Sequence, residues 1–180
     1  MSSTKYPRWI YYPRWSEPPA WVSKLIEIFR EHKAKIDSNL FHIKSDEALA
    51  IIRKDLEKNG FVVEGSKTQA TIRRPVHFGE YGAPDREYQI DAYHPQWKVG
   101  LEIEAGRSIR GNAIYRDIIQ TSLLVGVDYF VLSVPQKYSF QAKGKAITDQ
   151  TYEMCMLIFD AIYSSERLRL PLSGVLLIGY

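Results

Sequence analysis

Apolar residues recur at helical spacing in three parts of the chain. The first runs from residue 21 to about residue 32 and follows a Pro-Pro pair, which suits the first turn of a helix. The second covers residues 45–59, where Ser45 is the expected N-cap and Asn59-Gly60 the expected end. The third lies at about residues 149–165. We predict a helix in each of these segments.

Alternating and continuous apolar runs predict the strands. Residues 86–94 and 98–105 alternate between apolar and polar positions and are joined by a short turn, which predicts an antiparallel hairpin. Residues 128–134 are almost continuously apolar, as in a strand buried on both faces. A helical pattern at residues 112–125 precedes this strand and predicts a parallel crossover from the hairpin. The order predicts an α/β fold, a mixed sheet flanked by helices.

Two segments are predicted to lack strands and helices. Residues 1–17 contain Tyr-Pro-Arg-Trp twice, and prolines disfavour both a helix and a sheet ladder. We therefore expect an arm packed on the surface of a single domain formed by residues 18–180. In an alternative interpretation the arm contacts nucleic acid, with Arg8 and Arg14 on phosphates and an aromatic ring on a base. The basic stretch after residue 134 is expected to form a loop.

Composition narrows the class of protein. A chain of 180 residues with 45% hydrophobic residues corresponds to about one globular domain. No run approaches the ~20 apolar residues of a membrane-spanning helix, and the first residues lack the apolar core of a secretory signal. The only cysteine, Cys155, excludes an intramolecular disulfide and a Cys-built metal site. We expect a cytoplasmic protein whose net charge of +3 permits a polyanionic partner without requiring one.

Three acidic residues of the predicted hairpin fall on one face. Glu102 and Glu104 are two positions apart in a strand, so they point the same way, and Asp91 lies on the polar face of the partner strand. Asp91 is opposite Glu102 in one register and opposite Gly100 in the other. In the first register Gln89 is opposite Glu104. Either register brings three carboxylates within roughly 5–8 Å of one another.

Such a cluster of like charges is destabilising, and two arrangements relieve it. One carboxylate can keep a proton through a raised pKa, or a divalent cation can bind between the acids. Alternatively, Asp91 or Glu104 points to solvent and pairs with Lys98 or Arg107. Spacing alone leaves these alternatives open.

The acidic residues stand in a recognisable context. This part of the chain resembles the PD-(D/E)XK nuclease superfamily in the order of its parts. These are Gln89-Ile90-Asp91, then Gly100-Leu101-Glu102-Ile103-Glu104, then a polar helix and a buried strand. Its restriction-endonuclease-like core would cover about residues 45–135. Asp91 and Glu102 match the two acids of the motif. Glu104 stands where the family has lysine, as in a minority of type II restriction endonucleases, and Ile90 stands where it often has proline. The run from Glu102 to Arg107 and Leu170-Pro171-Leu172 also resemble uncharacterised bacterial restriction-endonuclease-like proteins.

The resemblance implies a function. Asp91 and Glu102 would hold Mg²⁺, for which Mn²⁺ can substitute, and Asp91, Glu102 and Glu104 would be the catalytic residues. The reaction would be hydrolysis of phosphodiester bonds in nucleic acid, DNA in preference to RNA, as in an endonuclease of restriction or genome defence. Glu104 would act as a general base or hold a second metal ion. A homodimer is expected by analogy, because cutting both strands of a duplex generally needs two sites.

Further residues are candidates for the site. Glu80 lies in a glycine-flanked loop before the hairpin, and Glu47 lies in the first turn of a predicted helix; either is a candidate accessory acid. Glu47 can instead favour the helix dipole, and Glu80 can be a plain surface carboxylate. Polar residues after the acidic strand are candidates for contacts with nucleic acid: Arg107, Arg110, Asn112, Arg116 and Gln120. Arg116 can instead pair with Asp117 or Asp128.

Two alternative functions remain open. The chain can be a catalytically inactive nuclease-fold module that binds nucleic acid or protein, which the missing lysine favours. The three retained acids argue against this, because an inactive site gains stability by losing their repulsion. It can also be a metal-dependent enzyme that acts on a small phosphate compound, because a net charge of +3 is modest for a protein that wraps a duplex.

Overall fold

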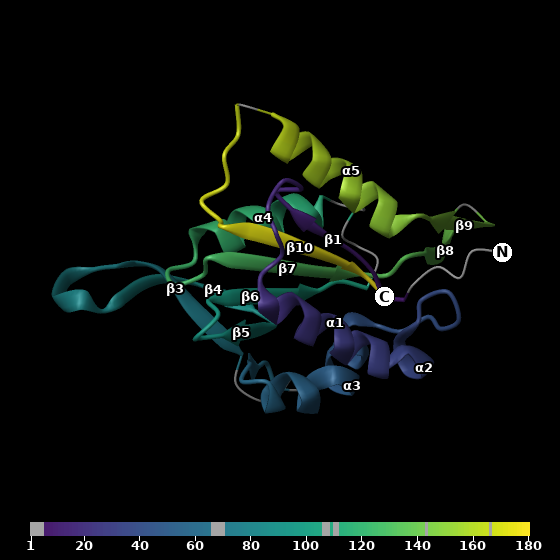
Figure 1. Cartoon of the computed structure of the whole chain (residues 1–180), viewed down its shortest axis with the longest axis horizontal. Coiled ribbons are helices and arrows are strands. Elements are labelled where there is room, and N and C mark those ends of the chain that lie inside the picture. The colour runs from purple at the N-terminus through teal and green to yellow at the C-terminus, as the bar shows by residue number, and fades with distance from the viewer. Residues whose placement is uncertain (1–5, 66–70, 106–108, 110–111, 143, 166) are drawn as a thin grey trace.

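The fold is a mixed six-stranded sheet between two layers of helices (Figure 1). The computed structural model describes residues 6–65, 71–105, 109, 112–142, 144–165 and 167–180. The strand order is β1-β10-β7-β6-β5-β2, in which β10, β7 and β6 run parallel and the others antiparallel to their neighbours. The predicted α/β fold with a mixed sheet is therefore confirmed. The strands are β1 (Arg8–Tyr12), β2 (Val62–Val63), β5 (Ala92–His94), β6 (Val99–Ile103), β7 (Tyr129–Val134) and β10 (Gly174–Gly179).

Helices cover both faces of this sheet. On one face lie α1 (Ala20–Glu31), α2 (Lys33–Ile36) and α3 (Ser45–Lys58); on the other lie α4 (Ala113–Leu123) and α5 (Thr151–Ser164) (Figure 1). The helices predicted in the three segments are confirmed. The predicted N-cap is displaced by one residue, because Lys44 occupies the cap and Ser45 is the first helical residue. None of the described helices has both the length and the apolar character that crossing a bilayer requires.

The central strands carry the predicted crossover. The chain passes from β6 through α4 to β7, and the two strands are parallel with Glu102 opposite Leu132. All six residues of β10 and the last five of β7 are buried, as expected for strands covered by helices on both faces. The buried strand and the crossover predicted from the sequence are thus confirmed.

The predicted unstructured arm is wrong for part of the N-terminal segment. Residues Arg8–Tyr12 form β1, an edge strand antiparallel to β10. The two neighbouring prolines flank this strand rather than interrupt it, so they remove no hydrogen-bond donor from its ladder. Arg8 forms an ion pair with Glu153, and the Arg14 guanidinium lies 2.6 Å from Asp160, both on α5. Both arginines of the repeated Tyr-Pro-Arg-Trp sequence therefore contact α5.

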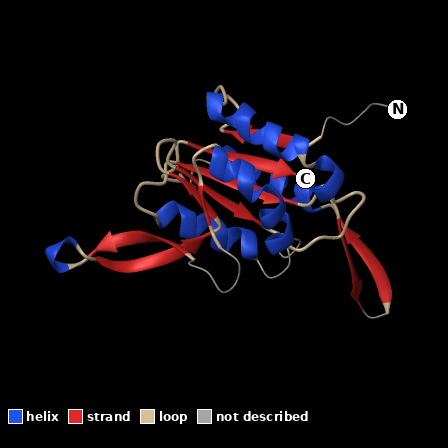
Figure 2. Cartoon of the chain, turned by 90° about the horizontal axis from the view of Figure 1, so that it is seen from below, coloured by secondary structure: helices blue, strands red, loops and turns tan. Residues whose placement is uncertain are grey.

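Two separate two-stranded ribbons project from the body of the molecule (Figure 2). One is formed by β3 (Ile72–Phe78) and β4 (Pro84–Ile90), with the short 3₁₀ turn η1 (Glu80–Gly82) at its tip. The other, β8 (Tyr138–Ala142) with β9 (Lys145–Asp149), occupies the segment for which a basic loop was predicted, and that prediction is wrong. In the structure, half-buried and exposed residues alternate along β8, as is typical of a strand with one face against the protein.

Candidate functional site

The acidic site forms where one predicted strand divides into two. Up to Ile90 the strand pairs with β3, and from Ala92 onward it pairs with β6. Ala92 is opposite Leu101, so the next position of this register places Asp91 opposite Glu102. This is the first of the two registers considered from the sequence.

The predicted partner of Glu104 is wrong. Gln89 lies opposite Arg73 of β3 and not opposite Glu104, because β4 leaves the main sheet before that position. The departure of β4 leaves the edge of β6 uncovered beside Asp91. A continuous alternating pattern cannot show such a change of partner, because both strands keep the same period of two.

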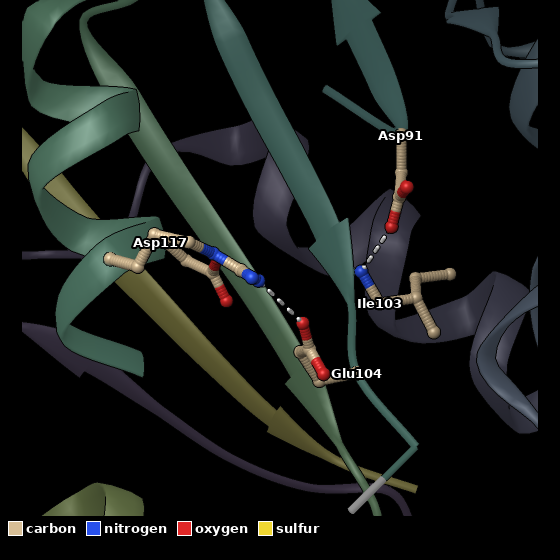
Figure 3. A network of polar contacts seen from close by, with 5 residues as sticks. Asp91, Ile103, Glu104 and Asp117 are labelled. Atoms are coloured by element: carbon tan, nitrogen blue, oxygen red, sulfur yellow. Dashed lines mark hydrogen bonds and ion pairs between the residues drawn. The ribbon is translucent and has the colours of Figure 1, made fainter. Parts of the chain in front are cut away.

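Backbone contacts fix Asp91 at the edge of the sheet. Its Oδ2 accepts a hydrogen bond of 2.7 Å from the backbone N–H of Ile103 (Figure 3). Its carbonyl oxygen accepts a second bond of 2.8 Å from the N–H of Glu64, which follows β2. The carboxylate of Asp91 is thus held against β6, and its backbone is held on the opposite side by the residue that follows β2.

Glu104 lies just past the end of β6 but is held in the line of that strand. Its N–H donates to the carbonyl of Ser133 at 2.9 Å, and its own carbonyl accepts from the Tyr180 hydroxyl at 2.9 Å. Its carboxylate points toward α4, where it lies 3.4 Å from a terminal nitrogen of Arg116 (Figure 3).

A fourth acid, Asp117 of α4, completes the cluster and was missed by the sequence analysis. Its side chain is only 4% exposed, and its Oδ1 accepts hydrogen bonds from Arg116 at 2.8 and 3.0 Å. Its Oδ2 is buried and meets no N–H or O–H donor within the described part of the chain. One sequence signal was available, because Asp117 falls on the helical stripe of Ile114 and Thr121, and a charged residue on an apolar stripe is unusual.

Three of the four acids line a pocket of about 280 Å³, and Glu104 lies outside the lining. Asp91 and Glu102 form part of its wall, and Asp117 lies across from them on α4. The full lining is Glu64, Gln89, Ile90, Asp91, Glu102, Arg116, Asp117 and Gln120.

Burial and mutual repulsion shift the two motif acids toward their neutral forms. Burial is the main cause that raises the pKa of Asp91 to about 6, and the Ile103 N–H opposes it. The pKa of Glu102 lies well above its ordinary value, first through burial and then through the charge of Asp91. The contact between these two carboxyl groups raises the pKa of Glu102 further and opposes the rise in the pKa of Asp91.

The second pair, Glu104 and Asp117, behaves in the same way. Burial and the charge of Asp117 raise the pKa of Glu104 to about 7, although Arg116 opposes the shift. Burial also raises the pKa of Asp117, against the stabilising contact with Arg116. The contact between Glu104 and Asp117 raises the pKa of Glu104 further and opposes the rise in the pKa of Asp117. The cluster thus contains more carboxylates than nearby cations, which is why each of its four acids has a raised pKa.

The two candidate accessory acids have other places in the structure. The carboxylate of Glu47 accepts a 3.0 Å hydrogen bond from the Lys44 N–H and so caps α3, as the helix-dipole alternative anticipated. The α3 acid whose charge reaches the site is Asp46, which raises the pKa of the pocket residue Glu64 after the larger effect of burial. Glu80 lies in η1 at the exposed tip of the β3–β4 ribbon, outside the pocket lining.

The candidate contacts to nucleic acid divide into three groups. Arg116 and Gln120 line the pocket, and Arg116 also pairs with Asp117 as the alternative interpretation stated. Asn112 is exposed at the N-cap of α4, outside the lining. Arg107 and Arg110 lie outside the described residues. The suggested pairing of Lys98 with an acid of the site is not observed, because its ammonium lies 3.0 Å from Asp128.

The acids suit a hard divalent cation in kind, but they are not assembled as a complete ligand set. Within the described ranges, no group of three or more His, Cys, Asp or Glu side chains is arranged to hold a metal ion. Magnesium needs less than this, because one or two carboxylates with waters and substrate oxygens suffice. Asp91 and Glu102 are two such carboxylates on one pocket wall, and a cation between them would offset the burial and repulsion that raise their pKa values.

Comparisons with protein-family profiles, with curated proteins and with solved structures find no match to this chain.

Proposed function

We propose that this chain is a metal-dependent phosphodiesterase that cleaves nucleic acid, DNA in preference to RNA, on a restriction-endonuclease-like core. The observation that carries the proposal is the register of β5 and β6, which sets Asp91 opposite Glu102 at the wall of a pocket. The β6–α4–β7 crossover then adds Asp117 and Arg116 from the adjoining helix. Strand, crossover helix and acids thus stand in the order expected of such a nuclease.

Asp91 and Glu102 are the residues that would hold the cation. Mg²⁺, or Mn²⁺ in its place, would neutralise charge on the phosphate and lower the pKa of a bound water. The Ile103 N–H holds one oxygen of Asp91 in place, and the cation would replace the direct contact between Asp91 and Glu102. A nearby cation would also lower the raised pKa of Glu102 through direct attraction.

Glu104 has the properties of a general base. A base works best with a pKa near the working pH, and the pKa of Glu104 is raised to about 7. Its carboxylate lies next to Asp117, which can share the proton that Glu104 accepts. Glu104 would thus take over the proton transfer that the missing lysine assists in the family.

Arg116 and Gln120 would bind the substrate phosphate. Both line the pocket, and the Arg116 guanidinium is the cation that faces Glu104 and Asp117. A guanidinium suits a phosphate because it donates two parallel hydrogen bonds. Binding of a phosphate there requires Arg116 to divide its donors between the substrate and the two carboxylates.

The test is a cleavage assay with a binding assay on the same variants. Wild-type protein with Mg²⁺ or Mn²⁺ should cut plasmid or oligonucleotide DNA, and Glu102→Ala should reduce cutting by several orders of magnitude. DNA affinity measured in EDTA should stay equal or become tighter, because the substitution removes a negative charge that faces the phosphate. Glu57→Ala, which removes an exposed carboxylate of α3, is the matched control and should cut like the wild type.

The same assays distinguish the inactive-module alternative. That alternative predicts no cleavage of single- or double-stranded DNA or RNA with any divalent ion, together with binding that Glu102→Ala leaves unchanged. Glu104→Lys and Glu104→Gln separate the two roles of Glu104. A substitute for the motif lysine should retain some activity as Lys, whereas a ligand of a second metal ion should lose activity in both variants.

A further inference from the structure

The β3–β4 ribbon starts at the acidic pocket and projects from the body of the molecule (Figure 2), and its two faces differ. Arg73 lies opposite Gln89, and Ile72 lies opposite Ile90. Opposite residues of an antiparallel ladder share a face, and successive residues of a strand alternate between faces. Arg73 and Gln89 are therefore on one face of the ribbon, which we call the Gln89 face, and the two isoleucines are on the other.

The face that carries Ile90 packs against the protein. Ile90 is buried in a hydrophobic cluster with Tyr93, and Tyr88 packs against the same cluster. Arg74, opposite Tyr88, also belongs to this face. Its guanidinium lies 4.2 Å from the centre of the Tyr93 ring and donates a 3.0 Å hydrogen bond to the carbonyl of Val125, just after α4. These contacts fix the base of the ribbon on the body of the molecule.

The Gln89 face is open to solvent at the mouth of the pocket. Gln89 lines the pocket and is exposed at the same time. Arg73 is exposed too, and within the described ranges its side chain has no hydrogen bond, ion pair or ring contact. Neighbouring strands lie about 5 Å apart, so Arg73 is one strand spacing from Gln89. Arg73 is therefore an unpaired cation held at the edge of the acidic pocket.

A phosphate chain that enters this pocket meets little positive charge. The lining has four carboxyl groups, those of Glu64 and of three acids of the cluster, and a single arginine, Arg116. The Arg116 guanidinium already contacts Asp117 and Glu104. A divalent cation would offset the acids at the scissile phosphate only. The adjoining phosphate of the same strand needs a cation at the pocket mouth.

We propose that Arg73 binds the phosphate next to the scissile one and so aligns a nucleic-acid strand along the Gln89 face. This inference rests on the proposed nuclease function and adds a positioning residue to it. A guanidinium suits a phosphate because it donates two parallel hydrogen bonds. The contact is confined to the pocket end of the ribbon. The next residue of the Gln89 face toward the tip is Glu87, whose charge repels a phosphate.

The salt dependence of DNA binding tests this contact without cleavage. The dissociation constant of a fluorescein-labelled DNA duplex is measured by anisotropy in EDTA. Loss of one phosphate contact lowers the slope of log K against log[salt] by about 0.9, so Arg73→Gln should bind about 8-fold more weakly at 0.1 M NaCl and about 4-fold more weakly at 0.2 M. Arg86→Gln is the matched control, because Arg86 is exposed on the same ribbon but on the face opposite Gln89. It should keep the wild-type slope.

Steady-state cleavage separates a positioning contact from the chemical step. Arg73 would touch a phosphate that does not react, so Arg73→Gln should raise KM more than it lowers kcat. Both arginines are exposed, so both variants should keep the wild-type circular dichroism spectrum.

The outcomes distinguish this inference from the proposed function. A wild type that cuts DNA, with an Arg73→Gln variant of wild-type affinity and slope, would overturn the inference and leave the proposed function intact. Equal losses in Arg73→Gln and Arg86→Gln would also overturn it, because they would show that the total charge of the ribbon acts rather than one contact. A wild type that neither binds nor cuts nucleic acid would overturn both.

Discussion

Asp91→Asn tests whether the acidic cluster is a source of instability that the protein keeps for function. Burial raises the pKa of Asp91 from its ordinary 3.8 to about 6. At about 1.4 kcal/mol per pKa unit, this shift lowers the free energy of unfolding by about 3 kcal/mol when the group is ionised. Asparagine has no charge, and its side-chain oxygen can still accept the bond from Ile103 N–H. The variant should therefore be more stable than the wild type when no metal is present.

The sign of the effect follows from the direction of the shift. The folded protein holds the proton more tightly than the unfolded chain, so the penalty is absent below the unfolded pKa of 3.8 and grows as the pH rises through about 6. The gain from Asp91→Asn should be about 3 kcal/mol at pH 8 and about half of that at pH 5. It should vanish below about pH 3.

Urea denaturation in EDTA, followed by the fluorescence of the four tryptophans, measures these free energies. Asp85→Asn is the control, because the Asp85 carboxylate is 65% exposed on the β3–β4 ribbon. That control should change stability by less than ~0.5 kcal/mol at either pH. An Asp91→Asn variant that is equally stable or less stable than the wild type at pH 8 would refute the reasoning.

Three further predictions concern the same region. Mg²⁺ in about hundredfold excess over its dissociation constant should raise the melting temperature of the wild type by about 5–10 °C. A Glu102→Gln variant that shows the same rise would contradict the role of Glu102 as a ligand. Arg116→Gln removes the charge that lowers the pKa of Glu104. The acidic limb of the pH–rate profile for DNA cleavage should therefore move up by about one pH unit. A limb at the wild-type pH would contradict the role of Glu104 as the base. Gly100→Ala should lower the free energy of unfolding by about 1–3 kcal/mol, because the added Cβ would lie 2.5 Å from the buried Ile90 side chain. A urea midpoint equal to that of the wild type would contradict this packing.

The parts of the fold that the sequence predicts are those in which one apolar pattern has one structural solution. Residues 128–134 are apolar on both faces, so they must lie in the centre of a sheet, and β7 does. The turn between the hairpin strands is short, which restricts the register and brings Asp91 opposite Glu102. These local constraints were sufficient to place Asp91 beside the acidic strand in one of two registers, and the observed register of β5 and β6 is the first of them.

The features that the sequence did not predict depend on contacts between distant segments. The β1 strand exists because β10 offers it an edge, 163 or more residues away along the chain, and its own prolines suggest the opposite. The change of partner at Asp91 depends on β3, which no alternating pattern reports. Asp117 joins the site because α4 packs beside the end of β6, a contact that helical spacing alone does not specify.

The central claim is that Asp91 and Glu102 hold a divalent cation, and a crystal soaked with Mn²⁺ tests it most directly. The account predicts an anomalous difference peak in the pocket, within about 2.0–2.3 Å of a carboxylate oxygen of each residue, and no such peak in Glu102→Ala crystals. Peaks confined to other parts of the surface, with the pocket empty in wild-type crystals at the same Mn²⁺ concentration, would contradict it.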